Sequence, residues 1–158
     1  MSIRNVIQQT FDEFGTTHKG RKKSGSWYLS GSDTLIVLNL QKSNYSPRYY
    51  INFGIWFLAV GPSNYPKTTH CHLQTRLEAL VADDDRPRLE GLLNLEEIMP
   101  DHVRHDELHA ALDDWLLPFV QTASSLSSIV TAAGHRLLAN SLLDRDGQRI
   151  LARLRRMP

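Results

Sequence analysis

Two histidines separated by one residue are the part of the sequence whose residue types and spacing could most directly do chemistry. Residues 70–77 alternate polar and apolar side chains, which is typical of a strand with one face on a core. On such a strand His70 and His72 project from the same face, a spacing that can supply two ligands to a zinc or iron ion. The sequence offers no obvious third ligand. Cys71 would face the core, where its thiol packs as a small hydrophobe instead of acting as a nucleophile.

A larger set of polar side chains is expected on the same sheet surface. Residues 34–42 and 49–58 carry apolar side chains at every second position and mixed ones between them. If the apolar faces pack on helices, the mixed faces of neighbouring strands form one amide-rich surface. This surface suits hydrogen bonding to a peptide or a small polar molecule, although an ordinary solvated sheet face has the same pattern. The candidate ligand-binding residues are Asn39, Gln41, Tyr50, Asn52, Trp56, His70, His72, Gln74 and Arg76.

Gly54 is expected near the centre of this surface. A glycine in a strand leaves room for another group to approach the backbone. The sequence therefore predicts an open approach to the sheet at Asn52-Phe53-Gly54.

A basic cluster offers a third chemistry. The residues Lys19-Gly20-Arg21-Lys22-Lys23 precede Trp27 and Tyr28, a combination that could contact phosphates or nucleic acid. The net charge of +1 argues against nucleic acid and favours a solvated basic turn. Residues 83–114 hold eleven acidic and three basic residues, so the charge is unevenly distributed and could steer a charged partner.

Sequence signatures of common enzymes are absent. The chain has no P-loop, no GxGxxG, no GxSxG and no HExxH motif, and Asp83-Asp84-Asp85 lacks the ligand spacing of a calcium loop. No catalytic residue and no cofactor is therefore predicted. The sequence favours a non-enzymatic binding or interaction module for a protein or a small polar ligand. A metal-assisted enzyme using His70 and His72, and nucleic-acid binding through Lys19–Lys23, remain the alternatives.

The elements that must position these residues follow from periodicity. Residues 3–14 place apolar side chains at helical spacing, with Ser2 as N-cap and Gly15 as the stop. Residues 16–26 read as a loop. Strands are predicted at 27–29, 34–42, 49–58 and 70–77, and the short connections between the first three imply an antiparallel meander. The strand at 27–29 is the expected exposed edge.

Helices are predicted for the rest of the chain. Residues 106–122 have a clear apolar stripe, with a kink expected from Pro118. Residues 124–156 read as further helix, with breaks near Gly134 and Gly147, while residues 88–99 are ambiguous. The predicted fold is therefore α+β, with an antiparallel sheet of about four or five strands and the N-terminal and C-terminal helices packed on one face.

Composition sets the remaining bounds. The length of 158 residues fits a single domain, residues 1–158, strand-rich over 27–80 and helical over 100–156. The lone cysteine, Cys71, excludes an intrachain disulfide and favours the cytoplasm. No apolar run approaches the ~20 residues that cross a bilayer, and residues 1–5 do not resemble a signal peptide.

Four segments of the sequence resemble one known family. Val37-Leu38-Asn39-Leu40-Gln41-Lys42-Ser43 looks like its N-x-Q-K-S strand end, and Tyr50-Ile51-Asn52-Phe53-Gly54 is similar to its I-N-L-G strand. The basic lead-in 22–28 and the segment 70–77 match more loosely. This is the bacterial family of domain of unknown function 4304, and the resemblance covers residues 5–80 best. It implies an α+β cytoplasmic domain of accessory or immunity type with no assigned catalysis.

Overall fold

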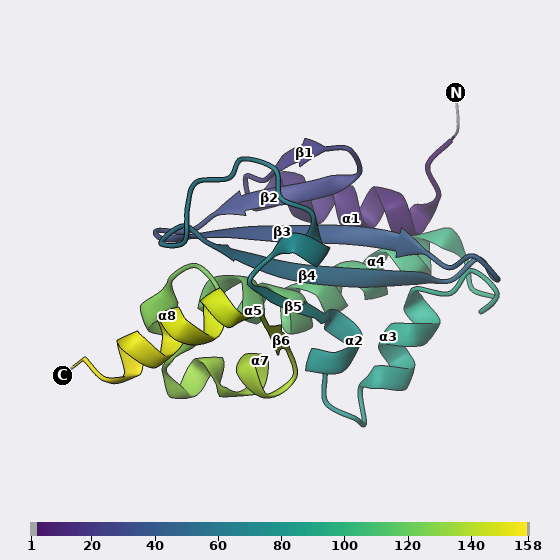
Figure 1. The fold of residues 1–158 in the computed structure, drawn as a ribbon. Coiled ribbons are helices and arrows are strands. Elements are labelled where there is room, and N and C mark those ends of the chain that lie inside the picture. Colours follow the sequence, from purple (N-terminus) through teal and green to yellow (C-terminus); the bar gives the residue numbers. More distant parts are fainter. Residues whose placement is uncertain (1–2, 158) are drawn as a thin grey trace.

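The strands form one sheet in which each strand pairs with the next in the chain. A computed structural model describes residues 3–157 of the protein. All neighbouring strands are antiparallel in the order β1-β2-β3-β4-β5-β6, so the predicted meander is confirmed (Figure 1). The sheet has six strands instead of four or five. The strands are β1 (Arg21–Lys23), β2 (Ser26–Ser30), β3 (Thr34–Lys42), β4 (Tyr49–Phe57), β5 (Leu73–Arg76) and β6 (Leu142–Leu143).

Both additional strands lie at the edges of the sheet. β1 occupies part of the stretch expected to be a loop, and it pairs with β2 across a two-residue turn in which Ser24 has φ 51° and Gly25 has φ 83°. Positive φ at both central residues is typical of the type I′ turn, which matches the twist of a hairpin. β6 lies within the segment expected to be helical. The prediction that residues 27–29 form the edge is therefore wrong, because β2 is covered by β1.

The helices pack on one face of the sheet, as predicted. Their side chains join those of Ile36, Leu38, Phe53 and Ile55 in one core. Residues 58–72 cross the other face, and their short 3-10 helix η1 passes in front of β3 and β4 (Figure 1). The helices are α1 (Val6–Thr17), η1 (Thr68–His70), α2 (Leu77–Leu80), α3 (Arg86–Leu92), α4 (Asp101–Ala111), η2 (Leu112–Leu116), α5 (Leu117–Thr122), α6 (Leu126–Ile129), η3 (Ala132–Gly134), α7 (His135–Ala139) and α8 (Arg145–Arg155).

Several predicted helix boundaries are corrected. The predicted helix at 106–122 begins earlier, at Asp101, and Pro118 follows a π-helical turn, η2, that accommodates the missing N–H donor. The predicted break at Gly134 is found between η3 and α7. Gly147 instead lies in the first turn of α8, where its N–H bonds the Asp144 carboxylate at 2.7 Å, and the chain breaks before it, at 140–144. No helix among residues 3–157 is long and apolar enough to span a bilayer.

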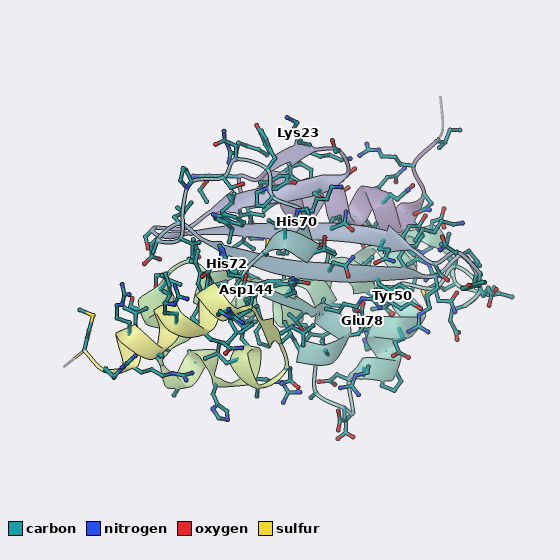
Figure 2. The ribbon with its side chains drawn as sticks, in the orientation of Figure 1. Lys23, Tyr50, His70, His72, Glu78 and Asp144 are labelled. Carbon is teal, nitrogen blue, oxygen red and sulfur yellow. The ribbon has the colours of Figure 1, made fainter. Side chains whose placement is uncertain are left out.

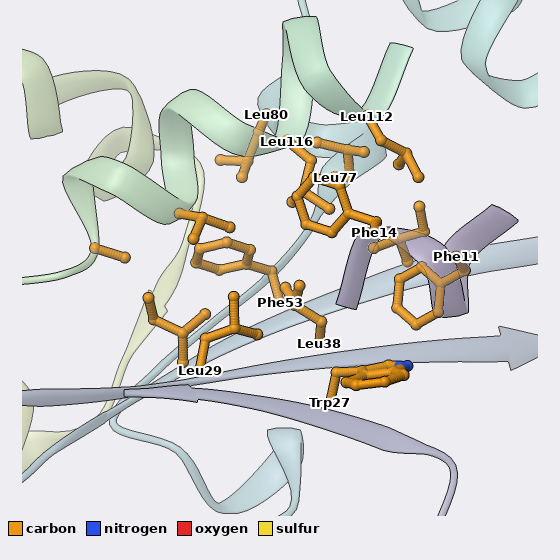
Figure 3. Packing of buried hydrophobic residues seen from close by; sticks show 14 of the residues in the cluster. Phe11, Phe14, Trp27, Leu29, Leu38, Phe53, Leu77, Leu80, Leu112 and Leu116 are labelled. Carbon is orange, nitrogen blue, oxygen red and sulfur yellow. The ribbon is translucent and has the colours of Figure 1, made fainter. Parts of the chain in front are cut away.

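The first helix is positioned by Trp27 (Figure 3). The indole packs beside Phe11 and Phe14, and its Nε1–H donates to Asp12 Oδ1 at 2.9 Å. The helix begins after Asn5, which caps it, whereas the predicted cap, Ser2, lies outside the described residues. Gly15 does not stop the helix. It lies against the Trp27 ring, and a Cβ at Gly15 would be 2.2 Å from Trp27 Cδ2.

Because Gly15 lies against Trp27, we predict that alanine substitution has opposite effects on stability at two helical glycines, Gly15 and Gly91. Gly15→Ala should lower the free energy of unfolding by about 1–3 kcal/mol, because the methyl group must displace a buried ring. Gly91→Ala in α3 is the matched control, since its Cβ would meet Glu97 Cγ at 3.7 Å, an ordinary contact. That substitution should raise stability by about 0.5–1 kcal/mol through helix propensity. Denaturant unfolding measures both, and equal stabilisation of the two variants would contradict the packing.

Candidate functional site

Six of the nine predicted residues lie together on the polar face, which is the face of the sheet opposite the helices. Strand pairing places Asn39 beside Asn52, and Asn52 beside Arg76, on three consecutive strands. Gln41 and Tyr50 are paired in the same way, two residues nearer to the turn between β3 and β4. Gln74 lies beside Gly54. Tyr50 is half-buried and is labelled in Figure 2, close to the turn between β3 and β4.

A cross-strand row runs through this part of the face. Lys23, Ser26, Asn39, Asn52 and Arg76 are directly opposed from β1 to β5. Asn39 Nδ2 donates to Ser26 Oγ at 3.1 Å, and Asn52 Nδ2 donates to Asn39 Oδ1 at 3.2 Å. Arg76 Nε donates to Asn52 Oδ1 at 3.1 Å. The side chains of four strands therefore form one hydrogen-bonded chain.

Arg76 is oriented by three neighbours but keeps donors for another molecule. Its Nη2 reaches Gln41 Oε1 at 3.3 Å, and its guanidinium carbon lies 4.6 Å from the centre of the Tyr50 ring. Asn52 Nδ2 also bonds Gln41 Oε1, at 2.9 Å. A guanidinium has five N–H groups, and these contacts use two of them. Because the side chain is exposed, the others can meet a ligand.

Trp56 and His72 lie on the polar face but are covered by residues 58–72. Trp56 Nε1 donates to the Gly61 carbonyl at 2.7 Å, and its ring centre is 4.3 Å from that of His72. His72 is 3% exposed, and its Nδ1 accepts from the Phe57 N–H at 2.8 Å. Burial lowers the pKa of His72 below its ordinary value. Both side chains therefore hold residues 58–72 against the sheet, and their polar groups are not available to a ligand.

The predicted common face of His70 and His72 is wrong. β5 begins only at Leu73, and His70 belongs to η1, where it is exposed and separate from the buried His72 (Figure 2). Within residues 3–157 no three His, Cys, Asp or Glu side chains come together to hold a metal ion. This geometry supplies no metal centre at the pair.

Cys71 occupies the space that Gly54 leaves. The thiol was expected to face the helices with Leu73, but it packs on the polar face in a small cluster with Tyr28, Leu35 and Val37. A Cβ at Gly54 would be 2.9 Å from Cys71 Sγ, so the expected opening at this glycine is filled by the protein itself. Burial raises the pKa of Cys71 to about 12, which keeps the thiol protonated.

Two hollows open on the uncovered part of the polar face. The first, of about 600 Å³, is lined by Gln41, Asn52, Gln74 and Arg76 together with residues 139–142. The second, of about 570 Å³, lies between the β1–β2 hairpin and residues 65–69. Gln41, Asn52, Thr68 and Thr69 line both. Each volume is in the range of small-molecule sites.

Part of this lining could not be read from the sequence. Ser26 follows from extending the alternation of Trp27 and Tyr28 by one residue, and Lys23 follows once β1 is recognised as a strand. Thr68 and Thr69 are brought over the sheet by the loop, where Gln74 Nε2 bonds the Thr69 carbonyl at 2.9 Å. Asn140 and Leu142 come from the far end of the chain. No local pattern signals these contacts.

Glu78 is a buried acid beside the site that the sequence did not single out. It follows β5 at the point where the strand ends, and its Oε1 accepts the Ile51 N–H of β4 at 3.2 Å. Its Oε2 is buried and has no hydrogen-bond partner among residues 3–157. Burial raises the pKa of Glu78 above its ordinary value of 4.5. The carboxyl thus continues the edge bonding of β4 where β5 turns into α2.

The fold and the site define an α+β domain whose antiparallel sheet presents a hollowed, amide-rich surface. The chain belongs to the family described as Domain of unknown function (DUF4304), whose model matches residues 17–122. This range includes the whole cross-strand row and reaches into α4 and α5. It begins at residue 17, so residues 5–16 of the stretch 5–80, to which the resemblance was assigned, lie outside the match. No curated protein and no solved structure matches the chain.

Because the Glu78 carboxyl is buried, we predict that Glu78→Gln raises the free energy of unfolding by an amount that depends on pH. The unfolded chain releases this proton near pH 4.5, but the folded protein releases it at higher pH. The free energy of unfolding therefore falls as pH rises from 4.5 through the raised pKa. Glutamine keeps the acceptor for Ile51 without the charge, so the variant should be more stable than the parent by about 1 kcal/mol at neutral pH.

Denaturant unfolding at pH 4.5 and 7.5 measures the effect, and the advantage of the variant should shrink at the lower pH. Glu96→Gln, an exposed acid, is the control and should show no such trend. A variant that is less stable than the parent at pH 7.5 would contradict this role of Glu78.

Proposed function

We propose that the protein is a non-enzymatic binding module that holds a small polar molecule or a segment of a partner protein on the uncovered part of its polar face. One observation carries the proposal: Arg76 is fixed by Asn52, Gln41 and Tyr50 at the side of a hollow of about 600 Å³, with guanidinium donors unused. A fixed, planar donor group in a hollow suits the recognition of carboxylates and other polar acceptors.

The chemical character of the lining supports binding over catalysis. The polar groups of the first hollow are amides, hydroxyls and one guanidinium, which bind by hydrogen bonding and do not readily exchange protons near neutral pH; Ala79, Ala139 and Leu142 add apolar surface. Three nearby groups that could attack or transfer protons, Cys71, His72 and Glu78, are buried. A metal-assisted reaction through His70 and His72 gains no support, because the two side chains do not converge.

Pre-organisation supports the same conclusion. Asn39, Asn52 and Arg76 are already linked by hydrogen bonds at 3.1–3.2 Å. Groups held in place before binding lose less conformational entropy when a ligand arrives, which increases affinity for a given set of contacts. We place this binding in the cytoplasm, an inference that depends on the single unpaired cysteine. An accessory or immunity-type role fits a module of this kind.

Removing both ends of the Asn52–Arg76 bond tests the proposal. The double variant Asn52→Ala, Arg76→Ala should retain less than about a tenth of the ligand or partner that the parent captures from lysate, since it loses charge-assisted bonds. Mass spectrometry of protein and small-molecule fractions measures the retained material. Stability should change by no more than about 1 kcal/mol, because Arg76 is exposed and Asn52 half-buried.

The pair Asn44→Ala, Arg145→Ala removes the same groups from exposed positions elsewhere and is the matched control. It should capture as the parent does. A double variant at 52 and 76 that captures the same material as the parent would show that these residues do not bind it, and one that fails to fold would show that they are structural.

A further inference from the structure

The second hollow has a different charge character from an ordinary polar surface. Lys23 and Lys67 line it, with hydroxyl groups from Ser24, Ser26 and Thr68. Within residues 3–157 no aspartate or glutamate lines either hollow. Two cations thus face a concave site together with neutral donors and no negative charge. Such a site attracts anions, and its concave walls strengthen the field.

Lys22 and Lys23 are neighbours on β1 and point to opposite faces of the sheet. Lys22 points to the helix side, where its Nζ bonds Asp12 Oδ2 at 3.0 Å. Lys23 points to the polar face, where its Nζ lies 4.1 Å from the centre of the Tyr65 ring. A cation–π contact holds the ammonium without using its N–H donors on an acceptor. Lys23 is therefore positioned but still able to bind an anion.

The walls of the second hollow are fixed by specific contacts. Tyr28 OH donates to the Pro66 carbonyl at 3.2 Å, and the Tyr28 and Tyr65 rings pack edge to face with centres 5.1 Å apart. On the opposite side, Ser24 takes a positive φ of 51° in the β1–β2 turn.

We propose that the second hollow is an anion subsite, in which Lys23 and Lys67 bind a phosphate or carboxylate group of a small polar ligand. The inference rests on the proposed function, because the rest of that ligand lies along Asn39, Gln41 and Asn52, which connect this hollow to the first. Four strand spacings separate Lys23 from Arg76, about 19 Å. The cross-strand row thus has a cation at each end and neutral hydrogen-bonding groups between them.

A small anion fits the site better than a nucleic acid does. Nucleic-acid surfaces depend on many phosphate contacts over an extended basic area. Here the cations on the polar face are few and lie in hollows, Lys23 and Lys67 in one and Arg76 in the other. Thr68 and Thr69 line both hollows, and each hollow has the volume of a small-molecule site and not of an extended strand.

Titration with simple anions tests the subsite directly. Inorganic phosphate and malonate are added to isotopically labelled protein at constant ionic strength, and the backbone amides of Ser26, Thr68 and Thr69 are followed by NMR. At least one probe should bind saturably, and comparison of the two shows whether phosphate or carboxylate is preferred. Lys23→Gln with Lys67→Gln should weaken binding about tenfold or more, because two charge-assisted contacts are lost.

The control carries the same change in charge on the other side of the sheet. Lys22→Gln with Lys42→Gln should leave the affinity within about twofold, since screening at fixed ionic strength removes long-range effects. Equal weakening by both pairs, no saturable shift with either probe, or tighter binding of a mixed-sequence single-stranded oligonucleotide than of phosphate would overturn the subsite.

These outcomes are separable from those of the binding proposal. If the ligand captured from lysate depends on Asn52 and Arg76 but not on Lys23 and Lys67, the module binds and the anion subsite is wrong. If phosphate or malonate binding depends on the lysines, but capture does not depend on Asn52 and Arg76, the binding proposal fails at its own residues.

Discussion

The antiparallel register of β1 to β5 is the constraint on which the candidate site depends. Trp27, Leu38 and Phe53 are directly opposed on the helix side, and they are 7%, 0% and 0% exposed. One residue along each strand, Ser26, Asn39 and Asn52 are opposed on the other side. A slip of one residue would exchange the faces, exposing the aromatic and leucine side chains and burying the amides. The apolar core therefore fixes the position of the polar row.

The polar face divides into two parts with different roles. Near the β2–β3 turn, residues 58–72 cover the polar face, and contacts of Trp56, His72 and Cys71 hold this segment against the sheet. Toward the β3–β4 turn it is open, and Arg76 and Lys23 mark the two sides of the exposed amides. Thr68 and Thr69 lie at the boundary between the covered and the open part. The segment 58–72 therefore covers one part of the polar face and also lines both hollows of the open part.

Local patterns predicted what depends on one or two strands. Alternation assigned the correct faces to every residue of β3 and β4, and it placed Asn39, Gln41, Asn52, Gln74 and Arg76 on one surface. Alternation failed where contacts between segments distant in the sequence determine the local structure. His70 left the predicted strand because the chain folds into η1 to cover Gly54, and β6 forms only because helices return Leu142 to the edge of β5. β1 was missed because three exposed basic residues show no alternation, although they pair fully with β2.

The proposal that the uncovered polar face is a pre-formed binding site can be tested directly by crystallography. The test is a screen with small carboxylate, amide and hydroxyl compounds. Bound compounds should concentrate in the two hollows, with polar atoms on Asn52, Gln41, Arg76 or Lys23 and with these side chains unmoved. Compounds that scatter over other surfaces, or crystals in which Arg76 and Asn52 separate and point into solvent, would contradict it.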